Sequence, residues 1–137
     1  MRHVPDKIIR IGGASGFWGE SAMATPQLLG AGVDYLVYDY LAEITMSIMA
    51  RAHAKDPAAG YAGDFISAVL KPHAKTIAAQ GVKVIANAGG VNPASCGEAA
   101  RALIKEQGLD LKVAVITGDN LLADLDAIAA NAPTEMF

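Results

Sequence analysis

Four short apolar runs divide the sequence, at residues 8–11, 35–38, 82–86 and 113–117. None of them alternates polar with apolar side chains, so both faces of each strand are expected to be buried. Stretches with helical spacing of apolar residues follow these runs, at residues 19–31, 42–54, 64–80, 93–107 and 121–130. Strands that alternate with helices predict right-handed βαβ units. We therefore expect an α/β fold of the Rossmann-like, three-layer type, with a mostly parallel sheet of about four strands.

Two prolines, a glycine and one loop refine this prediction. Pro26 indicates that the first helix begins late or is kinked, and Pro72 indicates a kinked or split helix because its ring removes a backbone donor. Gly108 is a natural C-cap, and the stretch KDPAAGYAG predicts a loop insertion at about residues 55–63. The 137 residues suit a single domain spanning 1–137. Four strands make only half of a doubly wound sheet, so we expect an incomplete domain or a shared sheet edge.

Composition excludes several classes of protein. A net charge of −3 without a Lys/Arg cluster argues against nucleic-acid binding. No apolar stretch approaches the roughly 20 residues of a membrane span, and the N-terminus lacks the core of a signal peptide. Cys96 is the single cysteine, which fits a reducing cytoplasm.

The 53% hydrophobic content favours a surface that meets another subunit, either in a homo-oligomer or with a companion chain or domain.

Small and polar residues follow all four predicted strands. Ligands of open parallel sheets bind beyond the carboxyl ends of the strands, because helix N-termini lie there. We therefore expect a small-molecule site at this edge. The candidates are Gly12, Gly13, Ser15 and Gly16 after the first run, Asp39, Tyr40 and Glu43 after the second, Asn87, Gly89, Gly90, Asn92 and Cys96 after the third, and Thr117, Gly118, Asp119 and Asn120 after the fourth.

The glycine-rich turn and the carboxylates each have two interpretations. GGASGFWG can hold an anion with its backbone N–H groups, but it matches neither G-x-G-x-x-G nor the P-loop, and a tight turn would also explain it. Asp39 and Glu43, about one helical turn apart, can serve as general acid and base or bind a hard cation. Alternatively, Asp39 caps the following helix. The three histidines show no metal-ligand spacing, so no metal is expected.

The stretch NAGGVNP carries two amides around a Gly-Gly turn. Asn87 needs a protein partner or a ligand, because an unpaired buried amide is costly. Asn92 is a natural N-cap, with Pro93 at the first helical position. Cys96 lies one turn inside this helix, where the helix dipole can activate a thiol. A buried, inert thiol is the favoured alternative, because no histidine is near it in sequence.

Four stretches, RIGGASGFWGES, DYLVYDYLAEITMS, KVIANAGGVNPASC and AVITGDNLL, together resemble the N-terminal region of the acyclic terpene utilisation (AtuA-type) family, formerly a domain of unknown function. The resemblance extends from residue 9 to residue 122, with the motifs in order. It implies catabolism of citronellol- and geraniol-type terpenoids and related branched acids through CoA thioesters. Members of the family are usually several times longer, often with a small ferredoxin-like companion domain, which implies a fragment, a truncation or a split subunit. The positions that fall on the family-like patterns are Gly12, Gly13, Gly16, Asp39, Glu43, Asn87, Gly89, Gly90, Asn92, Pro93, Gly118 and Asp119.

These observations predict an enzyme, or part of one, that binds an acyl-CoA or a small branched carboxylic acid. We expect a hydro-lyase that performs hydration or dehydration, with Asp39, Glu43 and Asn87 as the catalytic residues. The expected ligand-binding residues are Gly12, Gly13, Ser15, Gly16, Gly89, Gly90, Asn92, Thr117, Gly118 and Asp119. No cofactor is expected apart from the CoA thioester of the substrate. One alternative is a non-catalytic binding or scaffold subunit that needs a companion chain. A nicotinamide oxidoreductase is disfavoured without G-x-G-x-x-G, although Asp39 is placed like a ribose-binding acid.

Overall fold

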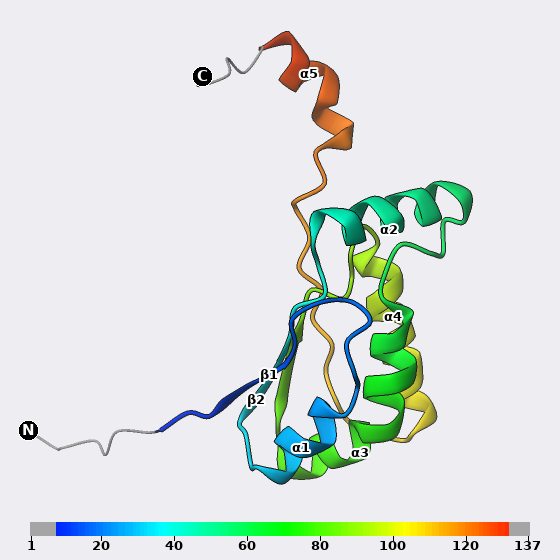
Figure 1. Cartoon of the computed structure of the whole chain (residues 1–137). Coiled ribbons are helices and arrows are strands. Elements are labelled where there is room, and N and C mark those ends of the chain that lie inside the picture. Colours follow the sequence, from blue (N-terminus) through cyan, green and yellow to red (C-terminus); the bar gives the residue numbers. More distant parts are fainter. Residues whose placement is uncertain (1–7, 132–137) are drawn as a thin grey trace, which may run out of the picture.

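The computed structural model describes residues 8–131. Three strands, β1 (Ile11–Ser15), β2 (Tyr35–Tyr38) and β3 (Lys83–Ala86), form a parallel sheet in the order β1-β2-β3. The helices are α1 (Ala24–Gly30), α2 (Glu43–Lys55), a π-helical segment η1 (Phe65–Leu70), α3 (Lys71–Gln80), α4 (Pro93–Glu106), a 3₁₀ turn η2 (Leu122–Asp124) and α5 (Leu125–Ala130). The chain is therefore α/β with an open parallel sheet, as the sequence predicts (Figure 1).

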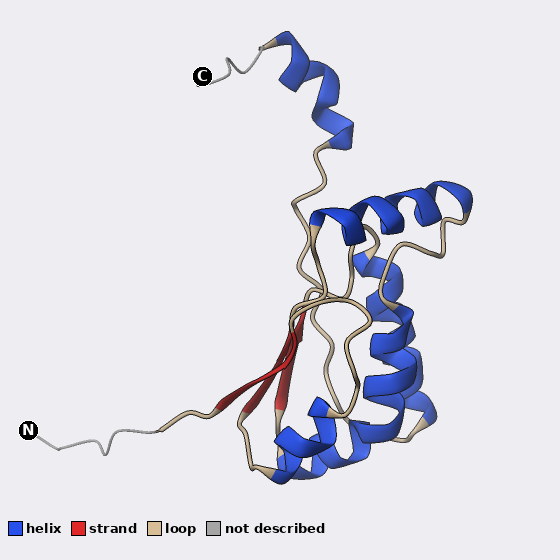
Figure 2. Cartoon of the chain, in the orientation of Figure 1, coloured by secondary structure: helices blue, strands red, loops and turns tan. Residues whose placement is uncertain are grey.

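The helices α1, α3 and α4 cover the same face of the sheet (Figures 1 and 2). Each strand pairs with the next along the chain, so both crossover connections run in the same direction across the sheet. Because such connections are right-handed, their helices lie on the same face of the sheet. The pleat then separates the side chains of each strand. Leu36 and Tyr38 of β2 point to the helices and are 0% and 2% exposed, whereas Ile11 and Ile85 lie on the outer face and are 68% and 55% exposed. Within the described residues, the expectation that both faces are buried therefore holds for the helix-covered face only.

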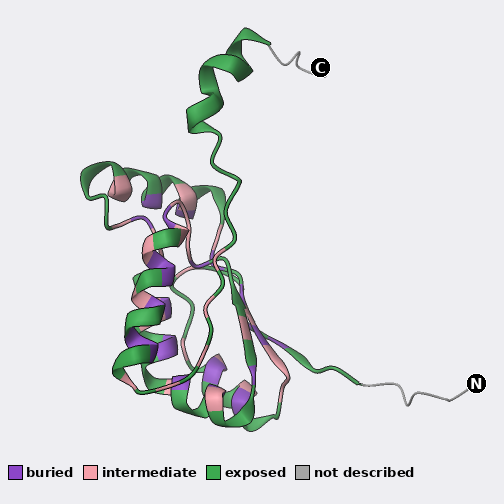
Figure 3. Cartoon of the chain, turned by 180° about the vertical axis from the view of Figure 1, so that it is seen from behind, coloured by how far each residue is buried: buried purple, intermediate pink, exposed green. Residues whose placement is uncertain are grey.

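The hydrophobic core lies between the covered face and the helices, where Figure 3 shows the buried residues of α3 and α4. Tyr38 and Tyr40 stack at a centroid distance of 5.9 Å, and Phe65 meets Tyr38 edge to face at 5.5 Å. Such aromatic pairs stabilise the folded state beyond the effect of burying their surface. This cluster connects β2 to η1 and so holds the carboxyl end of the sheet against the helix layer.

Two of the predicted strands differ from the structure. The first strand begins at Ile11 and extends through the glycines to Ser15, because Ile11 pairs with Tyr35, where β2 begins. The predicted strand at 113–117 is wrong: residues 109–121 have no regular secondary structure. In this segment the Val113 carbonyl accepts a hydrogen bond from Arg101 Nη2 at 3.1 Å, and Val115 packs closely against Gly97. The segment thus packs on α4. Within the described residues, no β-sheet hydrogen bonds pair it with β3.

The proline predictions agree with the structure. Regular helix α1 begins only at Ala24, and the predicted 64–80 helix is split into η1 and α3, with Pro72 in the first turn of α3. At the junction the Lys71 N–H donates to the Ile66 carbonyl in a wide turn, and Pro72 has no N–H to continue the pattern. Gly108 adopts the positive φ of +67° after α4, as expected of a glycine that ends a helix. None of the described helices is both long and apolar enough to cross a membrane.

Candidate functional site at the carboxyl edge of the sheet

The side chains of Asp39 and Asn87, which follow β2 and β3, bind each other. Asn87 Nδ2 donates to Asp39 Oδ1 at 2.6 Å, and Asn87 Oδ1 accepts from the backbone N–H of Tyr40 at 2.7 Å. Both residues are exposed. Asp39 does not cap α2, because the N-cap position is occupied by Ala42, without a side-chain hydrogen bond. The amide of Asn87 therefore orients a carboxylate that stays open to solvent.

Ser15, the last residue of β1, adds the third strand end to this arrangement. Its Oγ donates to the backbone carbonyl of Asp39 at 3.2 Å, and the Asp39 N–H donates to the Ser15 carbonyl at 3.1 Å. The structure thus brings together Ser15, Asp39 and Asn87, one from the end of each strand. This is the arrangement that parallel strands create at their carboxyl edge.

The glycines of the first turn have different environments. A Cβ on Gly12 would lie 3.0 Å from Leu28, so the missing side chain allows α1 to approach the sheet. Nothing lies within 4 Å of a Cβ on Gly13, which is on the outer face. The Gly16 N–H donates to Glu20 Oε2 at 2.7 Å. One N–H of this turn therefore binds a carboxylate of the protein itself, that of Glu20.

The Gly89-Gly90 turn packs against the 55–63 loop. Gly90 has a φ of +54°, and a Cβ there would collide with Met49 Sδ and lie 2.6 Å from the Gly60 carbonyl oxygen. A Cβ on Gly89 would lie 2.8 Å from Pro93. Both glycines are thus required by close packing.

Asn92 caps α4 as expected, and its side chain also holds the same loop. Its Oδ1 accepts from the Ser95 N–H at 3.3 Å, while its Nδ2 donates to the carbonyls of Pro57 and Ala59, both at 2.9 Å. This buried amide is satisfied by the protein itself.

Other candidates form no hydrogen bond with the Asp39–Asn87 pair within the described residues. Glu43 is the exposed first residue of α2, and Thr117, Gly118 and Asp119 are exposed on the extended segment after α4. No hydrogen bond between residues 8 and 131 joins any of these four to Asp39 or Asn87. Cys96 is buried in α4, and burial raises the pKa of its thiol to about 11, so it is protonated at neutral pH.

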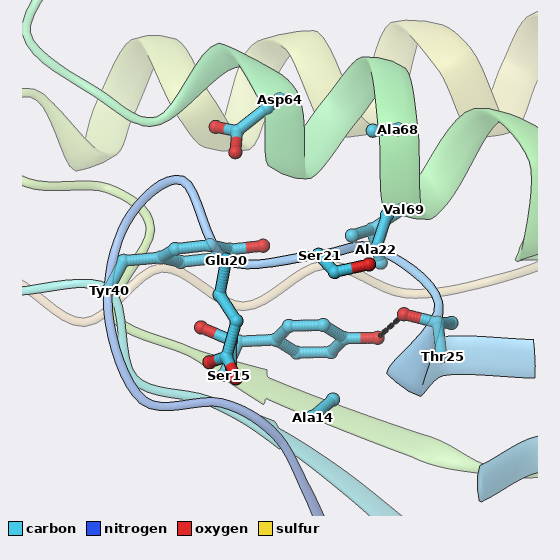
Figure 4. A pocket seen from close by; sticks show the side chains of 11 residues that line it. Ala14, Ser15, Glu20, Ser21, Ala22, Thr25, Tyr40, Asp64, Ala68 and Val69 are labelled. Carbon is cyan, nitrogen blue, oxygen red and sulfur yellow. Dashed lines mark hydrogen bonds between the residues drawn. The ribbon is translucent and has the colours of Figure 1, made fainter. Parts of the chain in front are cut away.

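A small pocket of about 40 Å³ lies between the glycine turn and η1 (Figure 4). Small apolar side chains, Ala14, Ala22, Ala68 and Val69, form part of its lining. Polar side chains form the rest: Ser15, Glu20, Ser21, Thr25, Tyr38, Tyr40 and Asp64. Ser15 connects the pocket to the Asp39–Asn87 pair, so the two features adjoin at one edge of the sheet.

Most polar groups in this pocket have protein partners. The hydroxyls of Tyr38 and Thr25 are 2.8 Å apart, and Asp64 Oδ1 accepts from Trp18 Nε1 at 2.8 Å. Tyr40 is different: it is only 3% exposed, and no residue in the described range forms a hydrogen bond with its hydroxyl. Burial, and then the nearby Asp64 carboxylate, raise the pKa of Tyr40 well above its usual value of 10.0. The phenol is therefore a neutral hydrogen-bond donor.

The sequence alone predicts no role for Glu20 or Asp64, and it predicts only that Tyr40 lies at a strand end. The spacing Tyr38-x-Tyr40 was a usable signal, because it puts both rings on the same side of an extended chain. Asp64 lies 46 residues from its partner Trp18, and no local pattern reports such a contact. The described residues contain no cluster of three or more His, Cys, Asp or Glu side chains arranged to bind a metal.

The family model described as "Acyclic terpene utilisation family protein AtuA" matches residues 9–136. The chain belongs to this AtuA family. Membership implies involvement in acyclic terpene utilisation and confirms the resemblance seen in the sequence. No curated protein and no solved structure matches the chain.

Three of the stretches that carry the AtuA resemblance pass through the carboxyl edge of the sheet. They supply Ser15, Asp39 and Asn87, which the structure brings into one hydrogen-bonded group. The fourth stretch, AVITGDNLL, lies in the extended segment after α4 and in η2. The carboxyl edge is therefore where three of the four AtuA-like sequence patterns meet in space.

Proposed function

We propose that this AtuA chain binds a small branched carboxylic acid or its CoA thioester at the carboxyl edge of the sheet and catalyses hydration or dehydration. In the dehydration direction, Asp39 removes a proton from the carbon next to the thioester carbonyl. The hydroxyl on the neighbouring carbon leaves as water after it receives a proton from a second acid, for which Glu43 is the candidate. A carbon–carbon double bond forms, and no oxidant or reductant is consumed.

The observation that supports this proposal is the hydrogen bond between Asn87 and Asp39. A general base must be held in a fixed orientation and must remain accessible to substrate. Asn87 fixes one oxygen of Asp39 at 2.6 Å, and Asp39 is exposed. The second oxygen has no hydrogen-bond partner within residues 8–131, so it is available to accept a proton.

Turnover of geranyl-CoA and of a short branched enoyl-CoA tests the proposal. Wild-type chain is expected to add water to the double bond, followed as loss of enoyl absorbance. Asp39→Asn keeps the shape of the side chain but cannot accept the proton, and it is expected to reduce turnover about 100-fold or more. The matched control, Asp110→Asn, changes an exposed carboxylate elsewhere and should keep full activity. Undiminished turnover by Asp39→Asn would refute the role of Asp39.

The outer face of the sheet favours a second candidate, a subunit that functions only with a companion chain or a second copy. Ile11 and Ile85 are 68% and 55% exposed on this face, where Ile11 is in register with Tyr35 and Ile85 is in register with Val37. Exposed neighbouring apolar residues of this kind commonly mark an interface. Sedimentation of wild-type chain and of Ile85→Lys distinguishes the candidates: a self-associating subunit dissociates when Ile85 is replaced, whereas a catalytic monomer sediments identically in both forms.

A further inference from the structure

Tyr40 is buried, but its hydroxyl oxygen is not completely inaccessible. Its ring is packed between Tyr38 and Phe65, with Tyr40 and Phe65 centroids 6.2 Å apart, which fixes the direction of the phenol. Gln107 Oε1 is the one completely buried side-chain oxygen or nitrogen without a hydrogen-bond partner among the described residues, so the Tyr40 oxygen retains some exposure, and Tyr40 lines the pocket. Figure 4 shows the hydroxyl pointing into the space below Asp64 and toward Ser21. A fixed donor therefore faces the pocket with its hydrogen bond unused.

The charges around this donor restrict what can accept its hydrogen bond. Two carboxylates, Glu20 and Asp64, line the pocket, and its lining includes no Lys, Arg or His. Each carboxylate has one oxygen engaged, Glu20 Oε2 with the Gly16 N–H and Asp64 Oδ1 with Trp18 Nε1. An anionic ligand in this space would add a third negative charge beside these two carboxylates, which disfavours a carboxylate or phosphate group.

We propose that this pocket binds the hydroxyl group of a neutral aliphatic alcohol. The alcohol oxygen accepts the hydrogen bond from Tyr40, and the alcohol O–H donates to the free oxygen of Glu20 or Asp64. A hydroxyl group satisfies both requirements because it donates and accepts at the same atom. The volume of about 40 Å³ accommodates a hydroxyl and its first carbons, which the alanines and Val69 contact.

This inference goes beyond the proposed function, because it concerns a pocket that the Asp39 proton transfer does not use. Ser15 lines the pocket and binds the Asp39 carbonyl, so a ligand can occupy the pocket with its hydroxyl and extend toward Asp39 with its chain. The two proposals can fail separately. Alcohol binding at Tyr40 does not require that Asp39 transfers a proton.

The test compares three probes that share one carbon skeleton: 2-methylpropan-1-ol, 2-methylpropanoate and 2-methylpropylammonium. Each is titrated into the ¹⁵N-labelled 137-residue chain, and the backbone signals of Ala22 and Ala68, which line the pocket, are followed. The alcohol is expected to shift both signals in a saturable manner. The carboxylate and the ammonium are expected to bind at least about tenfold more weakly. Equal or tighter binding of either charged probe would overturn the assignment to a neutral hydroxyl.

Two variants locate the binding. Tyr40→Phe removes only the phenol oxygen and is expected to weaken alcohol binding about tenfold, the usual effect of one lost hydrogen bond. Tyr35→Phe removes a phenol on the outer face, where Lys83 Nζ lies 3.5 Å from the hydroxyl, and should bind the alcohol like wild type. Unchanged alcohol affinity in Tyr40→Phe, or no alcohol binding by wild-type chain, would refute the proposal. Geranyl-CoA turnover measured on the same Tyr40→Phe sample reports separately on the Asp39 chemistry.

Discussion

Asn87 joins the carboxyl ends of two strands, because its amide donates to Asp39 Oδ1 at 2.6 Å and accepts from the Tyr40 N–H at 2.7 Å. One short side chain therefore orients the exposed carboxylate and satisfies the backbone where β2 ends. The position serves both folding and the candidate site, and mutation of Asn87 can separate the two roles.

Asn87→Ala is expected to lower the free energy of unfolding by about 1–2 kcal/mol, because both hydrogen bonds are lost and the Tyr40 N–H is left without its acceptor. Urea unfolding followed by the fluorescence of Trp18, the single tryptophan, measures this change. Asn131→Ala, which removes one exposed bond to the Ala127 carbonyl, is the control and should change stability by less than about 0.5 kcal/mol. Equal stability of the two variants would show that the Asn87 bonds contribute nothing.

Gly90→Ala is expected to destabilise the chain by about 3 kcal/mol or more, because it combines a positive φ with a collision against Met49 and the Gly60 carbonyl. The matched control is Gly13→Ala, whose Cβ would meet nothing within 4 Å. Gly13→Ala should stay within about 0.5 kcal/mol of wild type in the same urea titration. Similar losses in both variants would contradict the packing seen around the Gly89-Gly90 turn.

Stability is expected to fall with rising pH between 9 and 11 because of Cys96. Burial raises the pKa of this thiol from 9.0 to about 11, so between these values the unfolded chain loses a proton that the folded chain keeps. Deprotonation then favours the unfolded state, by about 2–3 kcal/mol at the upper end of the range. Cys96→Ala should reduce the slope of unfolding free energy against pH from pH 9 upward. An unchanged slope would contradict the burial of the thiol.

The two stacked tyrosines are expected to respond differently to loss of their hydroxyls. Tyr38→Phe leaves the fully buried Thr25 hydroxyl without its partner at 2.8 Å and should cost about 1–2 kcal/mol. Tyr40→Phe removes a hydroxyl that has no partner within residues 8–131, so the change in stability should stay below about 0.5 kcal/mol. Thermal unfolding of both variants measures the difference. Equal losses would imply that a protein group already binds the Tyr40 hydroxyl.

Local patterns predicted the elements whose ends are set by local chemistry. The β2 run and the α4 start were predicted because an apolar run and the Asn92-Pro93 cap mark them in the sequence itself. The carboxyl edge was also predictable, since topology alone brings the ends of parallel strands together. The position of β1 was not, because the strand begins at the residue that pairs with Tyr35, and the close approach of Leu28 of α1 to Gly12 is a contact distant in sequence.

The remaining differences arise from contacts distant in sequence. The 113–117 run has the composition of a strand, yet its carbonyl at Val113 is bound by Arg101, and its Val115 packs on Gly97 of α4. The pocket was missed for the same reason, since the chain places Asp64 beside Trp18 only through the packing of η1 on the aromatic cluster. Composition and spacing carry no signal for such pairings.

Among residues 8–131, β1 and β3 are the two edge strands of a three-stranded sheet. An edge strand presents a row of free N–H and C=O groups that can template pairing with another chain, and β3 has the short apolar sequence KVIA. Lys83 begins this strand and carries its ammonium 5.4 Å from the centre of the Tyr35 ring. The charge of Lys83 at the start of this edge strand opposes pairing of β3 with the edge of another molecule. We therefore expect that replacement of Lys83 by an apolar residue promotes fibrous aggregation of the chain.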